Sequence, residues 1–74
     1  MILDNSKDEV EIRRGYYNSG VLWWETPYVN GEKHGIEKFY CRSGVLSQET
    51  PYENGKIHGI EKWYYTSGAL MREI

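Results

Sequence analysis

A 24-residue sequence unit is written about two and a half times along this chain, so its fold must be a stack of similar pieces. Residues 15–38 and 39–62 align without gaps, and 16 of the 24 aligned positions are identical. A third, truncated copy occupies residues 63–74. Such self-similarity is typical of proteins in which each unit packs mainly against its neighbours.

Two kinds of turn signal divide each copy into strands. Asn30-Gly31 and Asn54-Gly55 are typical of tight hairpins, because Asn and Gly tolerate the positive φ angles that these turns require. The second signal is a Ser-Gly pair, found at residues 19–20, 43–44 and 67–68. The segments between the turns are rich in β-branched and aromatic residues and lack a helical period.

These signals predict an all-β fold, an open antiparallel β-meander of about six strands. The strands are expected near residues 10–17, 21–28, 35–41, 45–52, 59–65 and 69–74. Because every connection is short, successive strands should be antiparallel neighbours. Pro27 and Pro51 fall late in their strands and predict a bulge or bend there. Residues 1–9 are predicted to be a flexible N-terminus, and residues 10–74 a single domain.

One spacing pattern runs through the copies. In the first copy it reads Tyr16-x-x-x-Gly20-x-Leu22-x-x-Glu25-x-x-Tyr28-x-Asn30-Gly31-x-x-x-Gly35, and Tyr40 opens the next copy. This pattern resembles the MORN repeat, in particular its bacterial variant, and covers residues 15–74 almost completely. The resemblance implies an elongated sheet of stacked hairpins. It also implies protein interaction, membrane association in some eukaryotic members, or an antitoxin-like role for bacterial variants.

Composition argues against several classes of partner. Nine basic and eleven acidic residues give a net charge of −2, which does not favour nucleic acid or an anionic membrane. The single cysteine, Cys41, leaves no internal disulfide and favours a reducing compartment. The N-terminal residues do not follow the pattern of a secretory signal, and no apolar run approaches the roughly 20 residues of a membrane span. These features predict a cytoplasmic protein.

The sequence offers no constellation for catalysis or metal binding. His34 and His58 occupy equivalent turns in successive units, roughly 10 Å apart, too far to share one metal ion. They are expected to bond to backbone carbonyls instead. Cys41 replaces a tyrosine of the other copies without a histidine beside it, and is expected to be a half-buried strand residue. The chain is therefore predicted to be non-enzymatic, with no catalytic residue, cofactor or metal.

Strand alternation divides each unit into two faces. We expect Leu22, Trp24, Thr26, Tyr28, Ile36, Lys38 and Tyr40 on one face, and five glutamates with Trp23, Phe39 and Trp63 on the other. The glutamate face is either simply solvated or a contact surface for a basic or mixed protein partner. Trp23-Trp24 varies between copies, so it either carries specificity or caps the sheet. The candidate partner-binding residues are Trp23, Trp24, Glu25, Glu37, Phe39, Glu49, Glu61 and Trp63.

The leading hypothesis is a protein-binding module that docks a sheet face or edge on a partner such as a larger enzyme. In line with the resemblance, it would be a small inhibitor or antitoxin-like protein of bacterial or phage origin. The alternatives are an assembly module that self-associates, for example as a homodimer through a sheet edge or face, and a weak lipid-binding module. Nucleic acid is not an expected partner, and a membrane is a disfavoured one.

Overall fold

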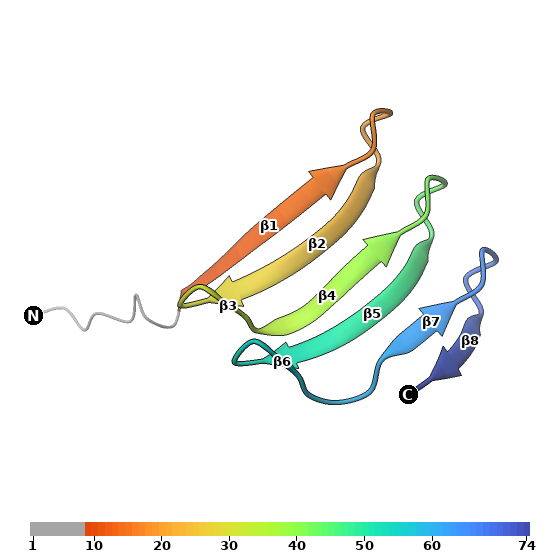
Figure 1. The fold of residues 1–74 in the computed structure, drawn as a ribbon. Helices are drawn as coiled ribbons and strands as arrows, with labels where there is room; N and C mark the ends of the chain where they lie inside the picture. Colours follow the sequence, from red (N-terminus) through yellow and green to blue (C-terminus); the bar gives the residue numbers. More distant parts are fainter. Residues whose placement is uncertain (1–8) are drawn as a thin grey trace, which may run out of the picture.

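The computed structural model describes residues 9–74 as an open antiparallel sheet (Figure 1). Its main strands are β1 (Val10–Tyr16), β2 (Leu22–Val29), β4 (Gly35–Tyr40), β5 (Leu46–Glu53), β7 (Lys62–Tyr64) and β8 (Leu70–Glu73), neighbours in that order. Two short strands, β3 (Glu32–Lys33) and β6 (Lys56–Ile57), pair with β2 and β5. The predicted all-β meander is confirmed. The flexible segment predicted for residues 1–9 lies, except for Glu9, outside the described residues.

The Asn-Gly turns have the backbone that their sequence predicts. Asn30 and Gly31 have φ angles of 53° and 82°, and Val29 pairs with Glu32 across the turn. Positive φ at both central residues is the type I′ geometry, whose twist matches that of the flanking strands. The second Asn-Gly pair repeats these angles within one degree. Both turns lie at the same end of the sheet (Figure 1).

The Ser-Gly turns lie at the other end and carry the bulges. In the first turn, the Tyr17 N–H donates to the Val21 carbonyl at 2.9 Å, and equivalent bonds recur in the other two. Just before this turn the register between β1 and β2 shifts, between Gly15 and Tyr16. The same shift recurs in the other two hairpins. Trp23 is therefore an extra residue on β2 at this point.

The bulge predicted at the prolines is wrong for the hairpin itself. β1 and β2 stay in register through the pair of Ile12 and Pro27. The Pro27 carbonyl accepts a hydrogen bond from the backbone N–H of His34 at 3.0 Å. Since the N and O of one strand residue point to the same side, the proline nitrogen, which has no hydrogen, also faces the next repeat. On that side the ladder between β2 and β4 is reduced to two pairs.

Gly35 completes this interruption. Its φ angle of 115° lies in the region that favours glycine, and a Cβ at this position would lie 2.8 Å from the Pro27 ring. The ring therefore packs directly on the Gly35 backbone. Both turn histidines bond to backbone carbonyls, as predicted, and they do so through their backbone N–H groups: His34 donates to Pro27 at 3.0 Å and His58 to Pro51 at 2.9 Å.

Within the described residues, the sheet buries no hydrophobic side chain. The buried residues are Thr26, Glu37 and Thr50, with exposed fractions of 1%, 7% and 2%. A single-layer sheet has no second layer to cover either face. Its stability therefore rests on backbone ladders, cross-strand pairs and partly covered aromatic rings.

The register shows that the predicted face of five glutamates is wrong. Glu25 lies opposite Lys38, and Trp24 lies opposite Phe39. Directly opposed residues share a face, so Glu37, two positions from Phe39, lies on the face opposite to Glu25. The physical reason is the two-residue turn, which pairs even-numbered residues with odd-numbered ones. Glu25 and Glu37 therefore do not repel each other across the strands.

Candidate interaction surfaces

One face carries a row of charged side chains that alternate in sign across all the main strands. In this charged row, each residue lies directly opposite the next: Arg14, Glu25, Lys38, Glu49, Lys62 and Glu73. The Arg14 Nε lies 2.7 Å from a Glu25 carboxylate oxygen. Opposite charges in such positions contribute about 0.2–1 kcal/mol per pair. Glu25 and Glu49 therefore have cationic neighbours within the chain and need no basic partner.

Glu49 has a further contact on this face. The Tyr64 hydroxyl donates a hydrogen bond of 2.6 Å to its Oε1. This hydrogen bond, together with burial, raises the pKa of Tyr64 above its ordinary value, because the neutral phenol is the donor. The bond joins β7 to β5 across two repeats.

The other face carries a row of large side chains. In this aromatic row the successive opposed residues are Gly15, Trp24, Phe39, Gln48, Trp63 and Arg72. The four central residues are half-buried, and the Arg72 guanidinium lies 5.5 Å from the centre of the Trp63 ring. Trp24 thus shares a face with Phe39 and Trp63, contrary to prediction. The row crosses the whole sheet.

Large and small residues exchange places along this row. A Cβ at Gly15 would collide with the Trp24 indole, so the ring lies over the β1 backbone. In the next copy the large residue is on the first strand instead, as Phe39 opposite Gln48. Each hairpin thus pairs one large aromatic residue with a small or flexible one. This supports the capping interpretation of Trp24, whose variation between copies follows from packing on β1.

Trp23 belongs to a separate cluster beside the first Ser-Gly turn. Its ring stacks on Tyr17 with centroids 5.5 Å apart, and the Arg42 guanidinium lies 4.8 Å from the Tyr17 ring centre. The Tyr17 hydroxyl donates to the Tyr40 carbonyl at 2.6 Å. Trp23 itself remains 46% exposed. The cluster ties the first repeat to the second.

Glu37 is engaged inside the sheet. Its Oε2 accepts a hydrogen bond of 2.6 Å from the Thr26 hydroxyl and lies 3.1 Å from the Lys33 Nζ. Burial of the Lys33 ammonium is the largest single influence and lowers its pKa, but the hydrogen bond to Glu37, together with the charge interactions with Glu37, Tyr52 and Tyr28, raises the pKa above its ordinary value. The Thr26–Glu37 hydrogen bond joins β2 to β4 beside the interrupted ladder at Pro27. Glu37 is therefore a structural carboxylate rather than a contact residue.

Glu61 and Cys41 have local roles in the sheet. The Glu61 N–H and carbonyl each bond to Ile74 at 2.9 Å and extend the β7–β8 ladder. Cys41 is half-buried with a free thiol, as predicted. Of the candidate partner-binding residues, Trp24, Phe39, Trp63, Glu37 and Glu61 therefore share one face, Glu25 and Glu49 lie on the other, and Trp23 lies at the bulge.

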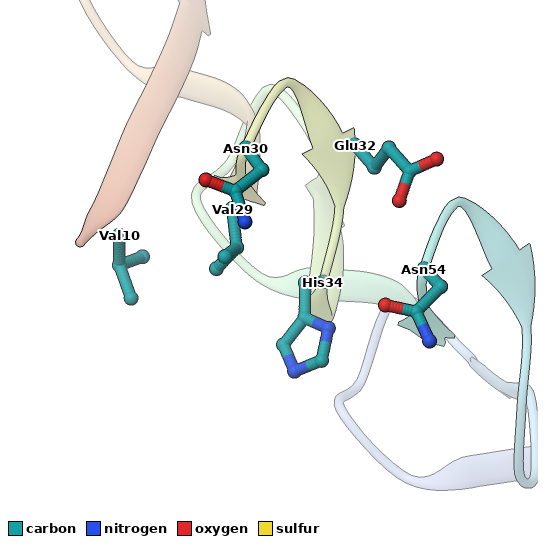
Figure 2. Close-up of a pocket in the computed structure, with 6 residues that line it drawn as sticks. All are labelled: Val10, Val29, Asn30, Glu32, His34 and Asn54. Atoms are coloured by element: carbon teal, nitrogen blue, oxygen red, sulfur yellow. The ribbon is translucent and has the colours of Figure 1, made fainter. Parts of the chain in front are cut away.

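A shallow depression of about 450 Å³ lies at the Asn-Gly end of the sheet (Figure 2). It is lined by Val10, Val29, Asn30, Glu32, His34 and Asn54. Figure 2 shows the Glu32 carboxylate turned away from the His34 imidazole, so the two groups do not converge in the depression. Across residues 9–74 no three His, Cys, Asp or Glu side chains gather as metal ligands, and no helix is long and apolar enough to cross a membrane.

Repeated hairpins in one layer, with both faces open, define a class of tandem-repeat scaffold proteins. The family model for the MORN repeat variant matches residues 33–54 and 57–74, more than half of the chain, and the chain belongs to this family. Its repeats are in general protein- or lipid-binding modules rather than enzymes. Residues 15–32 of the first copy precede the matched ranges, and the first copy has the same main strands and turns as the second. Searches of curated proteins and of solved structures found no match.

Proposed function

We propose that this protein is a non-enzymatic protein-binding module that docks the aromatic row on a folded partner. The observation that carries the proposal is the position of Trp24, Phe39 and Trp63 on one face of a sheet that no second layer covers. Aromatic residues and arginine dominate the energetics of known interfaces, and Arg72 stands at the end of this row.

The size of this face suits a protein partner. Six strands at about 4.8 Å spacing, each up to eight residues long, present a face roughly 24 Å by 26 Å. The flat area of such a face is about 620 Å², and the relief of its protruding rings brings the accessible surface close to the roughly 800 Å² that a standard interface buries on each partner.

The charged row supports a protein rather than a lipid surface as the partner. Attraction to anionic headgroups requires an excess of Lys and Arg on one surface. In the charged row every cation faces an anion, and the chain as a whole has a net charge of −2. The charged row is therefore a solvated face in this proposal.

A finer form of the proposal is that binding inhibits the partner. The resemblance to bacterial repeat variants supports an antitoxin-like protein, from a bacterium or a phage, that covers a working surface of a larger enzyme. The chain would then act by occlusion, since it needs no chemistry of its own to block access.

Replacing Trp63 with alanine tests the docking face. A partner captured from the native host by the wild-type chain should bind Trp63→Ala at least thirtyfold more weakly, the loss expected of an interface hot spot. Ile36→Ala is the matched control. Ile36 is 48% exposed, and it lies two residues from Lys38 on β4, so its side chain is on the face of the charged row, opposite to the aromatic row. Circular dichroism confirms that both variants fold.

Two results would contradict the proposal. The first is a captured partner whose affinity falls with Ile36→Ala but not with Trp63→Ala. The second is binding to phosphatidylserine vesicles with no protein partner, which would favour the lipid-binding alternative. Inhibition is tested separately by adding the chain to the captured enzyme and measuring its turnover.

A further inference from the structure

Apolar side chains at the two ends of the sheet are exposed, whereas the equivalent side chains in the middle of the sheet are half-buried. Tyr16 on β1 is 56% exposed, whereas its equivalents Tyr40 and Tyr64 are half-buried. Leu70 on β8 is 48% exposed, whereas Leu22 and Leu46 are half-buried. Terminal units of repeat arrays usually carry a polar outer side instead. Within residues 9–74, neither end of the sheet therefore resembles a polar cap.

Each end also has an open strand edge. Within the described residues, β1 pairs only with β2 and β8 only with β7, at opposite ends of the sheet (Figure 1). Such edges carry unpaired N–H and carbonyl groups that readily add another strand. In the repeat, β8 is the equivalent of β2 and β5, and β1 is the equivalent of β4 and β7. The chain already joins such strands twice, in the β2–β4 and β5–β7 junctions.

The charges at the two edges complement each other in the register of these junctions. Inside the chain, Glu25 lies opposite Lys38 and Glu49 opposite Lys62. At the 24-residue spacing, Glu73 takes the place of these glutamates, and Arg14 takes the place of these lysines. The β8 edge of one copy against the β1 edge of another would place Glu73 opposite Arg14. Two β1 edges paired about Arg14 would instead oppose two arginines.

A hydrogen-bond donor is also available at this edge. Across the first internal junction, the Tyr17 hydroxyl donates to the Tyr40 carbonyl at 2.6 Å. The equivalent donor at the second junction is missing, because that position is Cys41. In the third copy it is Tyr65, which is 52% exposed. The carbonyl of Tyr16 in a second copy would occupy the position of the Tyr40 carbonyl.

We propose that the chain assembles head to tail with further copies of itself, β8 of one pairing antiparallel with β1 of the next in the register of the internal junctions. The contact is heterologous, so every added copy presents a new edge. Growth produces an open filament, or a ring where the twist of the sheet closes it. The contact joins strand edges and places Arg72, at one end of the aromatic row, opposite Gly15 of the next copy. It leaves the face that carries Trp24, Phe39 and Trp63 open, so a partner can dock there independently.

Sedimentation velocity of the purified chain tests the assembly. The average mass is expected to rise with concentration beyond that of a dimer. A strict monomer at millimolar concentration, or a dimer that does not grow, overturns the proposal. Glu73→Arg and Arg14→Glu should each weaken association about tenfold, because each opposes like charges at the junction. Lys56→Glu, an equal charge change at an exposed position of β6, is the control and should associate like the wild type.

Charge exchange distinguishes head-to-tail pairing from pairing of like edges. The double variant R14E/E73R restores opposite charges at every β8–β1 junction and is expected to recover the association that each single variant loses. Pairing of two β1 edges predicts no recovery, and this result overturns the proposal. Circular dichroism of each variant verifies the fold.

If Arg14→Glu does not fold, a variant that keeps every charge still tests the proposed junction. Tyr65→Phe removes only the hydroxyl and should weaken association about threefold, in line with the loss of one hydrogen bond. The matched change Tyr17→Phe removes an internal bond and is expected to lower stability without changing association. An unchanged association of Tyr65→Phe overturns the proposed register.

Discussion

Replacing Thr26 with valine measures how much the buried carboxylate of Glu37 contributes to this thin sheet. Thr26 is only 1% exposed, and its hydroxyl donates a hydrogen bond of 2.6 Å to the Glu37 carboxylate. Valine has nearly the same shape but cannot donate. Glu37, itself 7% exposed, would then keep only its contact with Lys33.

The expected loss is large for a protein of this size. A hydrogen bond to a charged group contributes about 1.5–3 kcal/mol, and the strand preference of valine offsets a few tenths of this. We expect the free energy of unfolding to fall by about 2 kcal/mol. For a domain of this length the same loss lowers the Tm by about 8–16 °C. Two kcal/mol is a large share of the roughly 5 kcal/mol available to a small domain.

Urea denaturation followed by tryptophan fluorescence is the assay, and Thr50→Val is the matched control. Thr50 holds the same position in the next copy and is 2% exposed, but its oxygen accepts a neutral hydrogen bond of 3.1 Å from Gln48. Its loss should cost about 0.5–1.5 kcal/mol. If Thr50→Val costs as much as Thr26→Val, the charged bond is not the source of the effect.

A double-mutant cycle with Glu37→Gln gives a second check. Glutamine keeps the size of the side chain while removing its charge, so Thr26→Val should cost at least 1 kcal/mol less in that background. Additive losses would refute the coupling between Thr26 and Glu37.

Three further predictions follow from the same geometry. Gly15→Ala should lower the free energy of unfolding by about 1–3 kcal/mol, because the new methyl group collides with the Trp24 indole. Trp24→Gln in the same chain should relieve most of this loss. If urea denaturation gives additive losses for the two changes, the packing of Trp24 on Gly15 is contradicted. The pKa of Tyr64 is raised in the folded state above its ordinary value of 10.0, so the stability that its bond to Glu49 contributes is complete below pH 10.0 and is lost as the pH rises through the folded pKa. Tyr64→Phe should therefore flatten the fall in stability at alkaline pH. Alkaline unfolding curves that superimpose for the variant and the wild type would count against the bond to Glu49. Asn30→Ala should cost about 1–2 kcal/mol in thermal unfolding, because alanine is strained at a φ angle of 53°, and an unchanged Tm would exclude this turn geometry.

The repeat and its turn residues were sufficient to predict the strands and the meander. Part of the face assignment was also readable from sequence. The two-residue Asn30-Gly31 turn pairs even with odd positions, which puts Glu25 on the face of Lys38 and not on that of Glu37. The exact pairing of Glu25 with Lys38 lies two residues beyond the register of the turn and was not readable. The pairing of β1 with β2 was not readable. It depends on a register shift at Tyr16 that no residue in the Ser-Gly segment marks.

The buried contact of Thr26 with Glu37 left only a faint signal in the sequence. Thr26 and Glu37 both recur in the second copy, but Lys33, which neutralises the carboxylate, is replaced there by Ile57. The exchange of large and small residues between Gly15 and Trp24 becomes visible only once these two are known to lie opposite each other. The partner-binding role of the aromatic row remains a prediction that these experiments address.

Because the prolines interrupt the ladders between hairpins, the sheet resists bending less between hairpins than within them. β1 and β2 share seven residue pairs and β4 and β5 share six, whereas β2 and β4 share two and β5 and β7 share two. Each hairpin is therefore stiffer than the junctions between hairpins, and bending of the sheet concentrates at the junctions beside Pro27 and Pro51. Such a sheet changes its curvature by rotating whole hairpins, and so conforms to a rounded surface while every hairpin ladder stays intact.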